Sequence, residues 1–244
     1  MSFKIQWRCQ QGTRTHDNRD CAGVGIRDES ILAIMLDGST TGLASGPFAR
    51  EIARGLVDWF ATDTAEVTEL VLLERLRVMQ EDLSRDFGGA SASYVLVHAG
   101  PEKTALVLHA GDCLVGRHDS DAQVHWLLRP HTLANALAPV AIDILAKDET
   151  RHVLTRSFRS RRFVVPDVGA VELDDRPLLL ATDGFWAELD SERQTAFIDG
   201  GWQASERDRD DRSVLCISRS GARNVIEAPD THGPTSLYIR EASA

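Results

Sequence analysis

Five aspartate clusters stand next to apolar stretches of the sequence. Asp37 ends the run ILAIML and precedes Gly38, and Asp183 ends LLLAT and precedes Gly184. The other three clusters contain Asp20, Asp112 and the Asp210-Asp211 pair. A glycine after a strand lets the backbone turn tightly and approach a ligand, and carboxylates are the hard oxygen ligands that bind Mg²⁺ and similar cations. Because converging aspartates without basic partners repel one another, the pattern predicts bound divalent cations.

The segments that must position these carboxylates are a mixture of strands and helices. Residues 31–38 form a continuous apolar run typical of a buried strand, and residues 91–100, 104–112 and 122–128 are three short strands separated by hairpin loops. Helical spacing predicts one helix over 48–59, a second from a capping box at Asp63 and Glu66 to Gly88, and a third near 131–139. Since the helices are grouped, the order favours an α+β fold of packed antiparallel sheets with helices outside over a doubly wound parallel sheet.

Composition narrows the class of protein. The chain has 244 residues, 43% of them hydrophobic, and a formal charge of −10, which is enough for a sizeable core and disfavours nucleic acid or an anionic membrane as the main partner. No apolar run is long enough to cross a membrane, and the N-terminus lacks the apolar region of a secretion signal. The four cysteines form no C-x-x-C pair, and the histidines show no metal-ligand spacing. We expect one cytoplasmic domain over residues 1–244.

Six motifs, in order, resemble those of one family. They are NRD at 18–20, LDG at 36–38, GGASASYVLV at 88–97, HAGDC at 109–113, LLATDGFW at 179–186 and DDRSVLCI at 210–217. Their order and rough spacing are similar to those of the PP2C (PPM) metal-dependent serine/threonine phosphatases of bacterial type. The resemblance implies an αββα sandwich, two antiparallel sheets packed face to face and flanked by helices, with two Mn²⁺ or Mg²⁺ ions at one edge and a third, weaker ion.

The same resemblance implies a role for each matching residue. Asp37 would bridge the two metals, with the Gly38 carbonyl as a further ligand. Asp183 and Asp210 would complete the first site, Asp20 would lie near the second, and Asp112 with Asp183 would hold the third ion. Arg14 would bind the phosphate, since a guanidinium can engage two phosphate oxygens at once.

The chain departs from the family pattern in four places. Arg19 stands where the family has Glu or Gln, so the second metal site is predicted to be weakened if the guanidinium points toward it. Arg14 lies one residue further from Asn18 than usual, which leaves His16 as an alternative. The loop DGSTTG lacks the usual glycine pair and a histidine, so no histidine acid is predicted. The final motif DDRS leaves Asp210 and Asp211 as alternative ligands.

The leading hypothesis is a phosphatase that hydrolyses phosphoserine and phosphothreonine in proteins by attack of a water bridging two metal ions. Its substrate would be a phosphorylated protein, a cognate Ser/Thr kinase or the targets of that kinase. The alternative is a degenerate PP2C-like domain that binds a phosphoprotein or kinase without turnover, and an unrelated α+β hydrolase or binding module is a third candidate.

Overall fold

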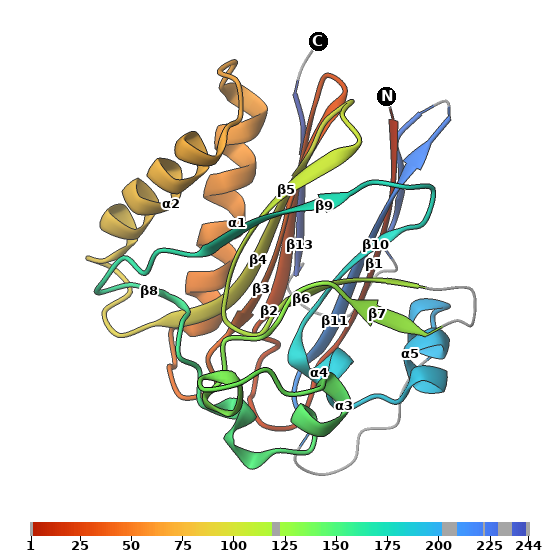
Figure 1. Ribbon diagram of the computed structural model, residues 1–244. Coiled ribbons are helices and arrows are strands. Elements are labelled where there is room, and N and C mark those ends of the chain that lie inside the picture. Colours follow the sequence, from red (N-terminus) through yellow and green to blue (C-terminus); the bar gives the residue numbers. More distant parts are fainter. Residues whose placement is uncertain (1, 119–122, 202–208, 222, 229–235, 243–244) are drawn as a thin grey trace.

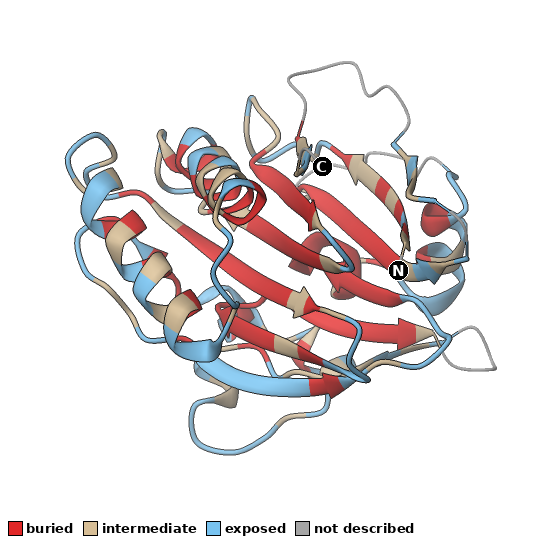
Figure 2. Cartoon of the chain, turned by 90° about the horizontal axis from the view of Figure 1, so that it is seen from above, coloured by how far each residue is buried: buried red, intermediate tan, exposed pale blue. Residues whose placement is uncertain are grey.

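The computed structural model describes residues 2–118, 123–201, 209–221, 223–228 and 236–242. Two β-sheets pack face to face, with helices on the outer face of each (Figure 1). The side chains between the sheets form a continuous apolar core that includes Ile5, Trp7, Met35, Val95 and Leu215. This core explains why the facing strands are almost entirely buried (Figure 2).

One sheet has six strands in the order β12-β1-β11-β10-β6-β7. Their bounds are β1 Ser2–Gln10, β6 Leu114–His118, β7 Val124–Trp126, β10 Leu178–Ala181, β11 Arg212–Ser220 and β12 Val225–Glu227. All neighbours are antiparallel except β1 and β12.

The other sheet follows the order β13-β2-β3-β4-β5-β9, with β8 paired to β4. Its strands are β2 Asp20–Arg27, β3 Ser30–Gly38, β4 Ser91–Ala99, β5 Thr104–Ala110, β8 Phe158–Arg159, β9 Asp167–Glu172 and β13 Leu237–Glu241. β13 runs parallel to β2, and the remaining pairs are antiparallel. The expected antiparallel sheets are therefore mixed, with one parallel pair in each.

Helices cover both outer faces. α1 (Ser45–Thr62) and α2 (Glu69–Leu83) pack on the seven-stranded sheet through Phe48, Ile52 and Leu76. α4 (Asp183–Trp186), α5 (Ser191–Ile198) and the short α3 (Ile142–Leu145) pack on the six-stranded sheet. The predicted αββα sandwich is thus confirmed. None of the described helices is both long and apolar enough to span a bilayer.

Two helix predictions were wrong. α2 begins at Glu69 and not at Asp63, because Asp63 ends α1 and the Thr68 hydroxyl caps α2 by accepting a hydrogen bond from the Val71 amide at 3.3 Å. The segment near 131–139 contains only the 3₁₀ turn Leu133–Asn135, and a second 3₁₀ turn covers Glu149–His152. This long connection between β7 and β8, which contains α3, lies at the same end of the sandwich as α4 (Figure 1).

Candidate metal centre and active site

Asp20 and Asp37 face each other across two neighbouring strands. Asp20 begins β2, Asp37 stands next to the last residue of β3, and the two are direct partners in the antiparallel register. Asp20 is fully buried, and its Oδ2 accepts a hydrogen bond from the Thr182 hydroxyl at 2.8 Å. Its Oδ1 has no hydrogen-bond partner among the described residues. Strand pairing alone therefore brings two carboxylates to one end of the sheet.

Asp112 is held by a tight turn between β5 and β6. Gly111 adopts a φ of 118°, and a Cβ at this position would lie 2.3 Å from the Ser93 hydroxyl oxygen. That oxygen accepts hydrogen bonds from the amides of Asp112 and Cys113 at 2.7 and 2.8 Å. Ser93 is a positioning residue that the sequence did not single out, although it lies inside the quoted motif GGASASYVLV.

Asp183 follows β10 and Asp210 precedes β11, and these two strands are neighbours in the six-stranded sheet. Asp183 begins α4 directly after β10, and a Cβ on Gly184 would lie only 2.0 Å from the Asp211 carbonyl oxygen. The glycine is therefore required for α4 to approach the chain before β11. Both carboxylate oxygens of Asp211 accept backbone amides, from Gly12 at 2.8 Å and Arg19 at 2.7 Å. Since Asp211 is engaged in this way, Asp210 is the member of the pair that faces the pocket.

These elements converge on one pocket of about 920 Å³. Four aspartates line it together with Arg14, namely Asp37, Asp112, Asp183 and Asp210. Asp20 lies behind this lining, hydrogen-bonded to Thr182. The structure thus brings together residues far apart in sequence, since Arg14 and Asp210 are separated by 196 positions. His16 is not among the lining residues, whereas Arg14 is.

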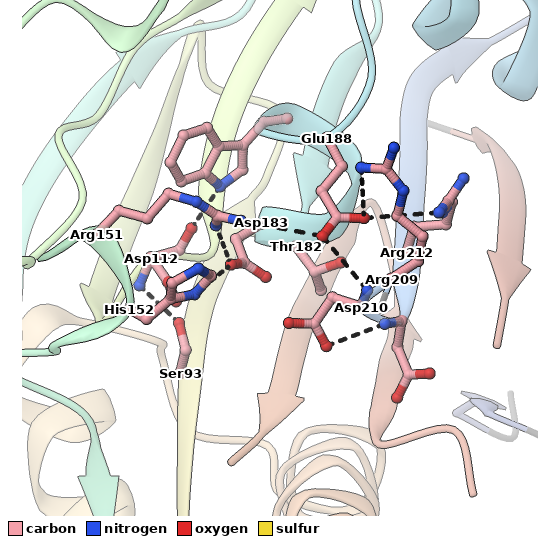
Figure 3. Close-up of polar contacts among 12 residues, drawn as sticks. Ser93, Asp112, Arg151, His152, Thr182, Asp183, Glu188, Arg209, Asp210 and Arg212 are labelled. Carbon is pink, nitrogen blue, oxygen red and sulfur yellow. Dashed lines mark hydrogen bonds and ion pairs between the residues drawn. The ribbon is translucent and has the colours of Figure 1, made fainter. Parts of the chain in front are cut away.

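The aspartates have basic partners that the sequence did not predict. The Nη1 of Arg151 lies 2.5 Å from the Asp183 Oδ2, and the Nη1 of Arg14 lies 2.5 Å from the Asp210 Oδ2. Glu188, whose side chain is 5% exposed, connects the two pairs, because its Oε1 lies 3.6 Å from Arg14 and 3.9 Å from Arg151. Figure 3 shows Glu188 between Arg151 and Asp210. The carboxylates are therefore partly neutralised by arginine. Arg151 was missed because it sits in the long connection before β8, where no local pattern marks it.

The Arg19 guanidinium is bound by the loop that follows Asp37. Its guanidinium Nη1 donates to the carbonyls of Ser39 and Gly42 at 2.7 and 2.9 Å, and its Nε lies 3.4 Å from Asp17. The side chain is buried, and it holds the loop that follows Asp37. Arg19 thus stabilises the DGSTTG loop, in which the usual glycine pair is missing, through hydrogen bonds to its backbone.

Burial and mutual repulsion raise the pKa values of the clustered carboxyls. Burial raises the pKa of Asp112 to about 8, with the Asp183 charge as the second cause. Burial and the Asp183 charge likewise raise the pKa of Asp210 to about 7. The pKa of Asp37 and that of Asp20 also lie well above the ordinary value, first because of burial and then because of neighbouring aspartates. The site therefore favours protons or other cations at neutral pH.

The donor set fits hard divalent cations. Buried carboxylate oxygens of Asp20, Asp112 and Asp183 have no hydrogen-bond partner within the described part of the chain. Buried polar atoms are normally paired, and unpaired carboxylate oxygens are the donor type that a hard cation binds. All candidate ligands are oxygen atoms, which suits Mg²⁺ or Mn²⁺ better than a softer metal.

A second group of potential ligands lies outside this pocket. His109, His131 and Asp167 place one ligand atom each within 4.8 Å of one another. The two imidazole rings are stacked, with centroids 4.4 Å apart and planes inclined by 14°. Since ring lone pairs lie in the ring planes, stacked rings cannot both point at one ion about 2.1 Å away. The His131 Nδ1 also accepts the Gly111 amide at 3.1 Å, so this group supports the Gly111 turn.

Comparisons with known proteins support the fold. No protein-family sequence model matches the chain, and no curated protein matches it in sequence. The serine/threonine phosphatase Stp1 from Staphylococcus aureus matches with a TM-score of 0.73 at 16% identity, covering 89% of this chain and 95% of that one. The S. agalactiae serine/threonine phosphatase matches with a TM-score of 0.68 at 20% identity, covering 89% and 100%.

A third solved structure is similar over most of its length. The catalytic domain of the serine threonine protein phosphatase PstP, in complex with two manganese ions, matches with a TM-score of 0.66 at 15% identity, covering 88% of this chain and 97% of that one. Sheet order, helix layers and the pocket at the sheet edge agree with the αββα architecture expected above. The chain therefore has the fold of the bacterial PP2C-type serine/threonine phosphatases.

Proposed function

We propose that this protein is a metal-dependent protein phosphatase that hydrolyses phosphoserine and phosphothreonine. The observation that carries the proposal is the convergence of Asp37, Asp112, Asp183 and Asp210, from separate strand ends, on one pocket. Buried oxygens of two of them lack partners among the described residues. The similarity in fold to serine/threonine phosphatases, one of them in complex with two manganese ions, supports the same activity here.

Two ions, and a third of lower affinity, would be held by the pocket carboxylates. Asp37 and Gly38 lie at the end of β3, where the Asp37 carboxylate would be a ligand of both Mn²⁺ or Mg²⁺ ions and the Gly38 carbonyl a further ligand. Asp183 and Asp210 would complete one site. Asp20 would support the second ion, and Asp112 with Asp183 the third. When bound, such ions would supply a water of lowered pKa and positive charge for the phosphate oxygens.

Among the arginines of the pocket, Arg14 is the one that pairs with the candidate metal ligand Asp210. It lines the pocket and is held by Asp210 and Glu188, so its orientation is fixed before a substrate arrives. A guanidinium in this position would bind and orient the phosphate of the substrate through paired hydrogen bonds. The substrate would be a phosphorylated protein, with a cognate Ser/Thr kinase or its targets as the expected partners.

A domain that binds phosphoproteins without turnover is the second candidate. The contacts of Arg151 with Asp183 and of Arg14 with Asp210, both at 2.5 Å, favour it, because each guanidinium already neutralises a candidate metal ligand. A metal must displace or share these contacts. The two candidates therefore differ in whether divalent cations outcompete two arginines.

Hydrolysis of p-nitrophenyl phosphate and of a phosphothreonine peptide, with Mn²⁺ titrated in and EDTA as the control, tests the proposal. We expect turnover that requires the metal and that is lost in Asp37→Asn. The matched control is Asp175→Asn, an exposed aspartate that is not among the lining residues of the pocket and should keep full activity. Activity that ignores EDTA, or full activity in Asp37→Asn, would refute the metal mechanism. Phosphopeptide binding without turnover at millimolar Mn²⁺ would favour the second candidate.

A further inference from the structure

The pocket has a second wall that the proposed chemistry does not use. Residues 159–162 have the sequence RSRR and form a tight turn, in which Arg159 and Arg162 pair across an isolated antiparallel bridge. Arg159, Arg161 and Arg162 line the same pocket as the aspartates. We call these three residues the arginine wall.

The backbone of the turn is firmly anchored to the sheet. β8 pairs with β4, so that Arg159 is the partner of Ser91. Ser160 is fully buried: its amide donates to the Ala90 carbonyl at 3.1 Å, and its carbonyl accepts from the Gln80 side chain at 2.6 Å. Its hydroxyl also accepts the Gly89 amide at 3.0 Å. The arginines are therefore carried by a backbone fixed through β4, the strand that also contains Ser93.

The arginine wall differs from the neighbouring arginines in that its positive charges are not paired with carboxylates. Arg14 and Arg151 pair with carboxylates of the site. By contrast, within the described part of the chain no carboxylate forms an ion pair with any member of the arginine wall. Arg159 donates to the Ser157 hydroxyl at 3.2 Å, and all three are exposed. In a protein with a net charge of −10, three unpaired cations on one wall indicate an anionic partner from outside.

The size of the pocket indicates that the anion belongs to the same substrate segment as the phosphate. A volume of about 920 Å³ is close to the upper end of the range for small-molecule sites, roughly 300–1,000 Å³, and far exceeds one phosphate group. Ser39 and Thr40 line it beside Asp37, whereas Leu154 and Ser157 line it beside the arginine wall. There is thus room for the residues that flank a phosphorylated side chain.

From these observations we infer that the arginine wall selects phosphoprotein segments that carry a further anionic group next to the phosphate to be removed. This inference rests on the proposed function. Guanidinium forks suit both carboxylate and phosphate oxygens, so acidic side chains and a second phosphate share the chemistry that the wall recognises. Arg161 and Arg162 are the specificity-determining residues that best test it, because Arg159 also holds Ser157.

The test compares kcat/KM for phosphothreonine peptides of one length in which the flanking residues are alanine, glutamate, phosphoserine or lysine. The wild type should prefer the glutamate or phosphoserine peptide over the alanine peptide by roughly tenfold, the equivalent of about 1.4 kcal/mol, and should disfavour lysine. The two anionic peptides separate carboxylate recognition from phosphate recognition. Because the attraction involves exposed charges, added salt should weaken the preference.

The matched variants are Arg161→Ala/Arg162→Ala and Arg193→Ala/Arg223→Ala. Both lose two exposed arginines, but Arg193 and Arg223 are not among the lining residues of the pocket. The preference should fall to near parity in the first variant and persist in the second, and Arg161→Glu/Arg162→Glu should favour the lysine peptide. Each preference is a ratio of two kcat/KM values measured on one protein preparation. A smaller fraction of folded protein lowers both values equally and therefore leaves the ratio unchanged.

Two outcomes overturn the inference: equal kcat/KM for alanine and anionic peptides in the wild type, or a preference that persists in Arg161→Ala/Arg162→Ala. Turnover of p-nitrophenyl phosphate without a preference among the peptides would overturn this inference and leave the proposed function standing. If no substrate is turned over, the proposed function fails, and fluorescence anisotropy of the labelled peptides with EDTA-treated protein tests the wall separately. Tighter binding of anionic peptides by the wild type than by the double variant supports it, and equal affinities overturn it.

Discussion

Removing divalent metals should make the stability of this protein fall as the pH rises, and Asp112 should account for a large part of the effect. Burial raises the pKa of this carboxyl to about 8, against an ordinary value of 3.8. The folded protein therefore holds this proton more tightly than the unfolded chain does. The associated stability is present at low pH and is lost as the pH rises through the window from about 4 to about 8.

The magnitude follows from the two pKa values. Between about pH 5.5 and about pH 8, ionising a group with a folded pKa of about 8 costs about 3 kcal/mol, at roughly 1.36 kcal/mol for each pH unit. For a chain of this length such a loss lowers Tm by about 6–12 °C. Mn²⁺ should remove most of the loss, since a bound cation replaces the proton as the partner of the carboxylate.

Urea unfolding of metal-stripped wild type and Asp112→Asn at the two pH values measures the effect. The amide does not titrate, whereas the other carboxyls are present in both proteins, so the difference between the two pH dependences isolates Asp112. We expect the wild type to lose about 3 kcal/mol more than the variant. Equal pH dependences for the two proteins would refute the reasoning that Asp112 is a buried carboxyl with a strongly raised pKa.

Three further predictions concern the residues around the metal centre. Arg151→Ala should destabilise the metal-free protein by about 3 kcal/mol or more, because it leaves Asp183 charged and buried without its partner. The loss should be clearly smaller with saturating Mn²⁺. Equal losses with and without Mn²⁺ in thermal unfolding would argue against a cation at Asp183. Arg19→Glu should not lower the Mn²⁺ concentration that gives half-maximal rate, because the Arg19 guanidinium donates hydrogen bonds to two loop carbonyls. A lower Mn²⁺ requirement of the variant in a titration would show that the charge of Arg19 opposes the metal. Asp210→Ala should abolish turnover. Asp211→Ala should chiefly lower the free energy of unfolding, by about 1–3 kcal/mol for each of the two backbone amides that lose their acceptor. A larger loss of turnover in Asp211→Ala than in Asp210→Ala would make Asp211 the metal ligand.

The parts of the fold that were predictable are those set by local patterns. The run ILAIML forms β3 because six consecutive buried side chains lie between α1 and the facing sheet. The aspartate positions follow from where such runs end. The start of α2 was not predictable in the same way, since Asp63 and Thr68 are both good caps and only the end of α1 decides between them.

The parts of the site that could not be predicted depend on contacts between distant residues. The arginine that neutralises Asp183 lies 32 positions earlier, in a connection without a regular pattern. The sequence position of Arg19 next to Asp20 suggested that its charge weakens the second metal site, whereas in the structure its guanidinium is bound by the Ser39 and Gly42 carbonyls. Side-chain direction at a turn is set by tertiary packing, which no local motif specifies.

We propose that the pocket aspartates bind divalent cations in place of their arginine partners. Anomalous diffraction from crystals soaked in Mn²⁺ tests it most directly, because the ions are located independently of activity. We expect two strong anomalous peaks in contact with the Asp37 carboxylate, one of them also touching Asp183 and Asp210, and Arg151 shifted from its position 2.5 Å from Asp183. Absence of anomalous density at Asp37, with Arg14 and Arg151 still paired to Asp210 and Asp183, would contradict the account.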